Sequence, residues 1–87
     1  MLRITRTDRD DATTLLLEGR LTRSEQAALD EACAACNGDG RRVVLDLAGI
    51  GFVDAAGASA LRLWRERRVL LTGCSPFVRE LLEGDTR

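Results

Sequence analysis

The chain has 87 residues, is 45% hydrophobic and carries a net charge of -1, which predicts one small globular domain over residues 1–87 and argues against a nucleic-acid partner, since phosphate binding needs a basic surface. No apolar run approaches the roughly 20 residues of a membrane helix, and no signal peptide opens the chain, so we expect a cytoplasmic protein without direct membrane insertion. The three cysteines are expected to be reduced.

The N-terminal segment predicts two paired strands. Leu2–Thr7 alternates apolar and polar residues, which is typical of an edge strand. After the polar turn Asp8–Asp11, the segment Thr13–Glu18 is more apolar and predicts a buried strand, antiparallel to the first. We expect Gly19 to end it.

A capping box predicts the start of the first helix. Thr22 and Glu25 have the spacing at which each side chain caps the backbone N–H of the other. The helix should run to about Cys36 and stop at Asn37 or Gly38, which suit a left-handed terminal position. Its apolar stripe comprises Leu29, Ala32, Cys33 and Cys36.

The central segment predicts a strand, a loop and a capped helix. Val43–Leu47 is apolar on both faces apart from Asp46, as in a central parallel strand. A short loop with Gly49 and Gly51 should follow, and Asp54 should cap a helix that runs from about Ala55 to Arg67. The inward stripe of that helix comprises Gly57, Ala60, Leu61 and Trp64, with Leu63 at its margin.

The C-terminal segment predicts a last strand and helix. Val69–Thr72 is the strand, and Gly73 ends it. Ser75 should cap the helix, with Pro76 in its first position, and Gly84 should end it. The apolar face of this helix comprises Phe77, Val78, Leu81 and Leu82. The order of elements predicts an α/β fold with about four strands in a mixed, largely parallel sheet and about three helices.

Few residues offer catalytic chemistry. The chain has no histidine, which removes the usual general base. Cys33 and Cys36 lie on an apolar stripe and are expected to pack, while Cys74 has no base near it in sequence. Asp54 should cap a helix and Asp46 should bond to nearby backbone. We therefore expect no enzyme activity, no cofactor and no metal site, with a thiol-based enzyme or redox sensor as the least favoured alternative.

The loops predict a binding surface instead. The segments that follow parallel strands gather at one edge of the sheet; here these are Gly19–Arg23, Ala48–Gly57 and Gly73–Pro76. The second contains small residues, which let another backbone approach closely. Its helix start offers free N–H groups to an anion or a partner's carboxylate.

The run Val43-Val-Leu-Asp-Leu-Ala-Gly-Ile-Gly-Phe-Val-Asp-Ala-Ala-Gly57, followed by Ala60-Leu61, resembles the central signature of the STAS domain, a family named after sulfate transporters and anti-sigma factor antagonists. Gly19-Arg20-Leu21-Thr22 resembles the family's entry to its first helix. Thr72-Gly73-Cys74-Ser75-Pro76 resembles its last strand and helix. The resemblance covers most of the chain and implies an adaptor.

In the antagonists of this family, the serine or threonine before the glycine is phosphorylated by a partner serine kinase, which is itself the anti-sigma factor. Here that position is Ala56, preceded by Ala55, and the nearest hydroxyl is that of Ser59. The resemblance therefore implies an adaptor that is not switched off by phosphorylation there.

The expected partner is a serine kinase-like anti-sigma factor. The alternatives are the ATPase subunit of a lipid-transporting ABC system and a chemosensory signalling complex; the oligomeric state stays open. Glutamate in place of Ala56 or Gly57 should abolish partner binding without unfolding the domain. The residues predicted to bind the partner are Arg20, Thr22, Phe52, Asp54, Ala55, Ala56, Gly57, Ala58, Ser59, Cys74 and Ser75.

Overall fold

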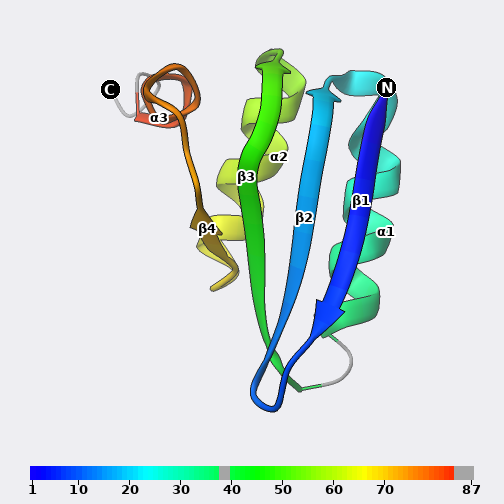
Figure 1. The fold of residues 1–87 in the computed structure, drawn as a ribbon. Coiled ribbons are helices and arrows are strands. Elements are labelled where there is room, and N and C mark those ends of the chain that lie inside the picture. The colour runs from blue at the N-terminus through cyan, green and yellow to red at the C-terminus, as the bar shows by residue number, and fades with distance from the viewer. Residues whose placement is uncertain (38–39, 84–87) are drawn as a thin grey trace.

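The computed structural model describes residues 1–37 and 40–83. Four strands form one sheet in the order β1-β2-β3-β4 (Figure 1). They are β1 (Leu2–Asp8), β2 (Ala12–Leu21), β3 (Arg42–Val53) and β4 (Leu70–Thr72). β1 is antiparallel to β2, and the other two pairings are parallel. The prediction of a mixed, largely parallel sheet is confirmed.

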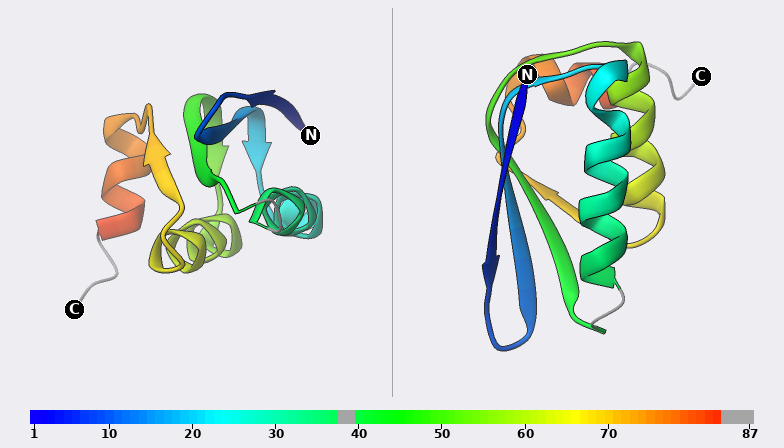
Figure 2. Two further views of the ribbon diagram at one scale, coloured as in Figure 1. Left: turned by 90° about the horizontal axis from the view of Figure 1, so that it is seen from below. Right: turned by 90° about the vertical axis from the view of Figure 1, so that its right-hand side faces the viewer.

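The helices cover one face of this sheet. A 3-10 turn (Arg23–Glu25) leads into α1 (Gln26–Asn37), and α2 (Ala55–Glu66) and α3 (Pro76–Glu83) follow later in the chain. Figure 2 shows α1 and α2 on the same side of the sheet, with α3 beside β4. In the described part of the chain no helix covers the opposite face, so Val44 and Asp46 of β3 are half-exposed. β3 is a central parallel strand, as predicted, although its second face is only half-buried.

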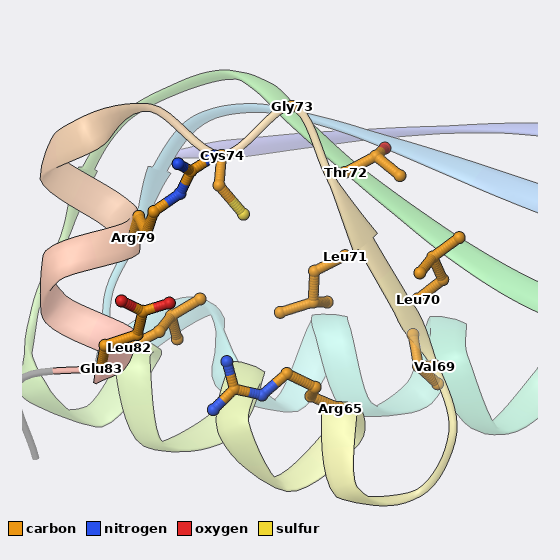
Figure 3. Close-up of a pocket in the computed structure, with 10 residues that line it drawn as sticks. All are labelled: Arg65, Val69, Leu70, Leu71, Thr72, Gly73, Cys74, Arg79, Leu82 and Glu83. Atoms are coloured by element: carbon orange, nitrogen blue, oxygen red, sulfur yellow. The ribbon is translucent and has the colours of Figure 1, made fainter. Parts of the chain in front are cut away.

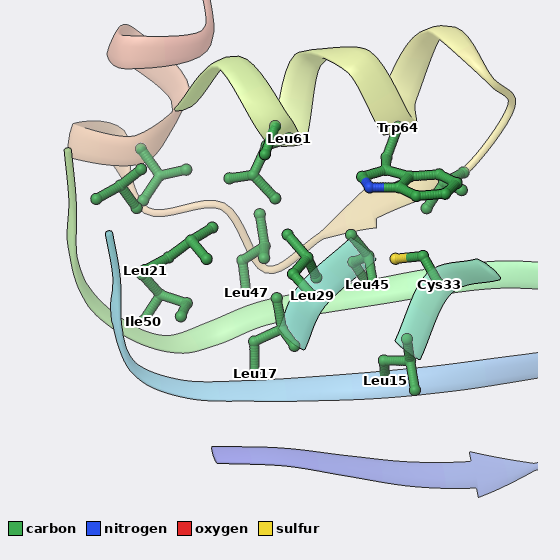
Figure 4. Packing of buried hydrophobic residues seen from close by; sticks show 14 of the residues in the cluster. Leu15, Leu17, Leu21, Leu29, Cys33, Leu45, Leu47, Ile50, Leu61 and Trp64 are labelled. Atoms are coloured by element: carbon green, nitrogen blue, oxygen red, sulfur yellow. The ribbon is translucent and has the colours of Figure 1, made fainter. Parts of the chain in front are cut away.

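The core lies between the sheet and the helices. Over residues 13–17 of β2 and 43–47 of β3 every second side chain is buried, as the period of two in a strand requires when one face is covered. Figure 4 shows these side chains against those of α1 and α2. The largest fully buried side chains are Leu15, Leu17, Leu21, Leu29, Leu45, Leu47, Leu61 and Val78, with Thr13, Cys33 and Cys36.

Cys33 and Cys36 pack in this core, as predicted. Burial, followed by the neighbouring Cys36 and Asp30, raises the pKa of the Cys33 thiol to about 12. A thiolate is the reactive form of cysteine. Cys33 is therefore held in its unreactive form at neutral pH.

The expected helix caps form. The Glu25 carboxylate accepts a hydrogen bond from the Thr22 backbone N–H at 3.1 Å, which is part of the predicted capping box. The Ser75 hydroxyl oxygen accepts from the Val78 backbone N–H at 3.2 Å and caps α3. The expected helix stops at Gly38 and Gly84 lie outside the described residues.

Two strands are longer than predicted. β2 continues past Gly19 to Leu21, and β3 continues through the supposed glycine loop to Val53. The two extensions pair with each other, with register shifts after Leu16 and Gly19. Gly19 adopts a φ of 108°, which a glycine tolerates without strain. The loop prediction was wrong because pairing with a neighbouring strand outweighs the low strand propensity of glycine.

The last helix turns differently from the prediction. Val78 and Leu82 are buried and Leu81 is half-buried, but Phe77 is 49% exposed. Phe77 therefore does not belong to the inward face. A helix of eight residues buries only a narrow stripe, and Val78 and Leu82, four positions apart, define it.

Candidate functional site

The carboxyl ends of β2 and β3 bring two predicted site residues together. Arg20 pairs with Phe52 in the parallel register, and Leu21 pairs with Val53. The Arg20 guanidinium lies over the Phe52 ring, 4.9 Å from its centroid, so the two side chains form one cation–π unit. α2 begins two residues after β3 ends, which places its first turn at the same end of the sheet (Figure 1).

Asp54 connects the starts of two helical segments. One carboxylate oxygen accepts from the Gly57 backbone N–H at 2.7 Å and caps α2. The other accepts from the Arg23 backbone N–H at 3.0 Å, at the start of the 3-10 turn. Asp54 therefore caps the helix as predicted, and its second hydrogen bond connects the start of α2 to the 3-10 turn that follows β2.

The hydrogen bond from Gly57, followed by that from Arg23, lowers the pKa of the Asp54 carboxyl from 3.8. A folded-state pKa below the unfolded value means that the carboxylate stabilises the fold above the unfolded pKa. This stability is lost as pH falls through the folded pKa.

We therefore expect Asp54→Asn to lower the free energy of unfolding at pH 7, because an amide nitrogen cannot accept the second hydrogen bond. This gap, the difference in free energy of unfolding between variant and wild type, should shrink below about pH 4. It should close once the wild-type carboxylate is protonated. Urea unfolding at pH 7, 5 and 3 measures it. Asp10→Asn, at an exposed position, is the control; a gap that persists undiminished in acid contradicts the prediction.

Two of the predicted site residues are not accessible. Gly57 and Ala58 are buried in the first turn of α2. A Cβ atom at Gly57 would lie 2.4 Å from the carbonyl oxygen of Leu21, closer than real Cβ atoms come to any neighbour. The structure therefore contradicts the expectation that glutamate at Gly57 would leave the fold intact. Gly57 therefore allows α2 to approach β2 closely.

Five of the predicted residues are accessible at this end of the sheet, and we refer to them together as the docking surface. Phe52, Arg20, Ala55 and Ser59 are exposed, and Ala56 is half-exposed. The Ser59 hydroxyl accepts a hydrogen bond from the Arg62 guanidinium at 3.2 Å. Thr22 lies next to this surface, but its hydroxyl donates to the Glu25 carboxylate. The docking surface comprises Arg20, Phe52, Ala55, Ala56 and Ser59.

Cys74 and Ser75 belong to a different feature. Both are half-buried in the connection between β4 and α3. The Ser75 hydroxyl is engaged in capping α3, and Cys74 lines a cavity between β4 and α3 (Figure 3).

Sequence reasoning missed two residues that shape the docking surface. Arg62 donates to the carbonyl oxygen of Leu81 at 3.0 Å and so connects α2 to α3. The carbonyl of Leu21 accepts from the Asp54 N–H at 3.2 Å and sets the spacing at Gly57. Neither role has a sequence signal, because both depend on contacts between elements that are distant along the chain.

Over residues 1–37 and 40–83, no group of three or more His, Cys, Asp or Glu side chains is placed to hold a metal ion. Within the same ranges no helix has the length and apolar character needed to cross a membrane.

Comparison with known proteins gave the following similarities. A family model described as "Mlab, STAS domain" matches residues 4–84. The unphosphorylated form of the anti-sigma factor antagonist SpoIIAA aligns with a TM-score of 0.71 and 15% identity, over 95% of this chain and 82% of that chain. The crystal structure of Mglu aligns with a TM-score of 0.72 and 22% identity over 83% of this chain, which spans 20% of Mglu. At these identities the two solved structures show the fold alone. No curated protein sequence matches this chain.

Proposed function

The chain belongs to the STAS domain family, and from this premise we propose that it is a non-catalytic adaptor that binds a signalling protein through the docking surface. The fold of an anti-sigma factor antagonist supports the proposal. We propose a serine kinase-like anti-sigma factor as the partner and the cytoplasm as the place of binding.

The observation that carries the proposal is the accessibility of Ala55 and Ala56 at the start of α2. Ala55 and Ala56 have only methyl side chains, so they leave the helix backbone open to close approach. Phe52 adds an exposed aromatic ring, and Arg20 lies over it. Aromatic and arginine side chains are the residue types that most often dominate binding energy at interfaces.

The absence of a hydroxyl at Ala56 determines how binding would be regulated. A phosphoryl group at this turn would add about −1.5 to −2 units of charge at a surface built for close contact. Neither Ala55 nor Ala56 can accept one, and Ser59 lies further along α2 with its hydroxyl bonded to Arg62. We therefore propose that the chain stays constantly competent to bind.

Ala56→Glu should weaken partner binding at least about tenfold, since a charge that is desolvated without a partner costs more than 1.4 kcal/mol. The variant should stay folded, because Ala56 is half-exposed and a carboxylate is favourable in the first turn of a helix. Crosslinked complexes from the native cell identify the partner by mass spectrometry, and titration of the purified partner gives the affinity.

Ala34→Glu is the matched control, because Ala34 is exposed on α1, away from the docking surface; its affinity should stay within about twofold of wild type. Equal affinities for the two variants would place the interface elsewhere. Recovery of an ABC transport ATPase and no kinase-like protein would replace the proposed partner with the alternative one.

A further inference from the structure

A cavity of about 430 Å³ lies between β4, the second half of α2 and α3, on the side of the molecule away from β1 (Figures 1 and 3). This volume is within the range of small-molecule sites in proteins, roughly 300–1,000 Å³. Three aliphatic side chains form its inner wall: Val69 and Leu82 are buried, and Leu71 is half-buried. The cavity therefore offers an aliphatic wall that can cover the apolar body of a ligand.

Two arginines flank this apolar wall. Arg65 comes from α2 and Arg79 from α3, and Figure 3 shows both guanidinium groups at the cavity. Within the described ranges neither guanidinium has a hydrogen bond or ion pair, whereas the guanidinium of Arg62 in α2 donates to Leu81 and Ser59. Glu83 contributes one carboxylate to the lining. Among the described residues that line the cavity, two cations stand against one anion, a net positive charge.

From this combination we propose that the cavity binds an organic anion with an apolar body, such as a medium-chain carboxylate. The aliphatic wall covers the body, and the two guanidinium groups hold the anionic head by charge-assisted hydrogen bonds. Arginine is suited to this role because its planar fork matches the geometry of a carboxylate. The site is separate from the docking surface, so binding of the anion does not depend on the proposed partner.

Cys74 provides a direct readout of occupancy. It lines the cavity and is half-buried, whereas Cys33 and Cys36 are buried in the core. Iodoacetamide should therefore alkylate Cys74 first in the folded protein. A ligand in the cavity should cover the thiol and slow that reaction.

The test measures the rate of Cys74 alkylation in the full chain against increasing decanoate, kept below its micelle concentration. Decanoate should slow the reaction saturably. Hexanoate and octanoate should bind progressively more weakly, by about three- to fourfold for each methylene removed from the apolar wall. Decanol and decyltrimethylammonium, which have the same chain without the anion, should protect at least about tenfold more weakly.

Arg65→Gln and Arg79→Gln should each weaken decanoate binding by about tenfold or more, with protection measured against each variant's own alkylation rate without ligand. Arg3→Gln makes the same change at an exposed position on the opposite edge strand and should have no effect. The proposal is overturned if decanoate gives no protection, or if decanol protects as well as decanoate does. It is also overturned if protection is unchanged in a variant that carries both Arg65→Gln and Arg79→Gln. Protection only by a peptide with an apolar C-terminal residue also overturns it, and assigns the cavity to a protein segment.

Discussion

Replacing Gly57 with alanine is expected to lower the free energy of unfolding by about 2–3 kcal/mol, the usual cost of inserting an atom into a closely packed site. The new Cβ would lie 2.4 Å from the carbonyl oxygen of Leu21 and 3.1 Å from its carbonyl carbon. Leu21 is fully buried, so the obstacle is backbone that cannot turn aside. Urea unfolding followed by circular dichroism measures the change.

The sign of this effect is diagnostic. At a helical position with free space, alanine is more favourable than glycine by about 1 kcal/mol. A Cβ at Gly51 would meet its nearest atom, the carbonyl oxygen of Gly19, at 3.9 Å. Gly51 lies in β3 rather than in a helix, but a Cβ there has ordinary contact distances, so Gly51→Ala should be neutral or slightly stabilising. If Gly57→Ala stabilises the domain, α2 does not approach β2 as closely as described.

Replacing Trp64 with alanine is expected to cost about 3–5 kcal/mol, a large share of the roughly 5–15 kcal/mol that stabilises a typical domain. Trp64 is 5% exposed and is the only tryptophan in the chain. Its indole N–H donates to the Asp30 carboxylate at 2.8 Å and connects α2 to α1. The substitution thus leaves a cavity and a carboxylate without its donor.

Two variants separate these contributions. Trp64→Phe keeps most of the volume but removes the donor, and should cost about 1–2 kcal/mol. Leu63→Ala changes the preceding residue, which is 44% exposed, and should stay within about 1 kcal/mol of wild type. Because the tryptophan variants lose the intrinsic fluorophore, far-UV circular dichroism is the measurement. A loss for Leu63→Ala as large as that for Trp64→Ala would contradict the assigned packing.

Predictions that depended on local chemistry agree with the structure. Asp54 and Ser75 cap their helices because a side-chain oxygen next to a helix start finds free N–H groups within a few residues. Cys33 and Cys36 are buried because their spacing places them on one helical stripe. The prediction that Phe77 lies on the inward face of the last helix was wrong, because on so short a helix the direction of that face depends on the neighbouring elements.

The candidate site was predicted only in part. The sequence shows the run of small residues after Asp54, but it does not show which of them are accessible to solvent. Gly57 and Ala58 face the core, while Ala55 and Ser59 face solvent. The pairing of Arg20 with Phe52 arises from extensions of β2 and β3 that local propensity assigned to loops.

The amino-acid sequence by itself determined the order of strands and helices, their caps and the absence of a hydroxyl at Ala56, because each of these follows from residues within a few positions of one another. Only the tertiary structure decided that Gly57 is a packing position against Leu21, and that Arg65 and Arg79 face one apolar cavity. The physical reason is that both arrangements depend on the distance between elements far apart in the chain, which is set when the core packs and has no local pattern.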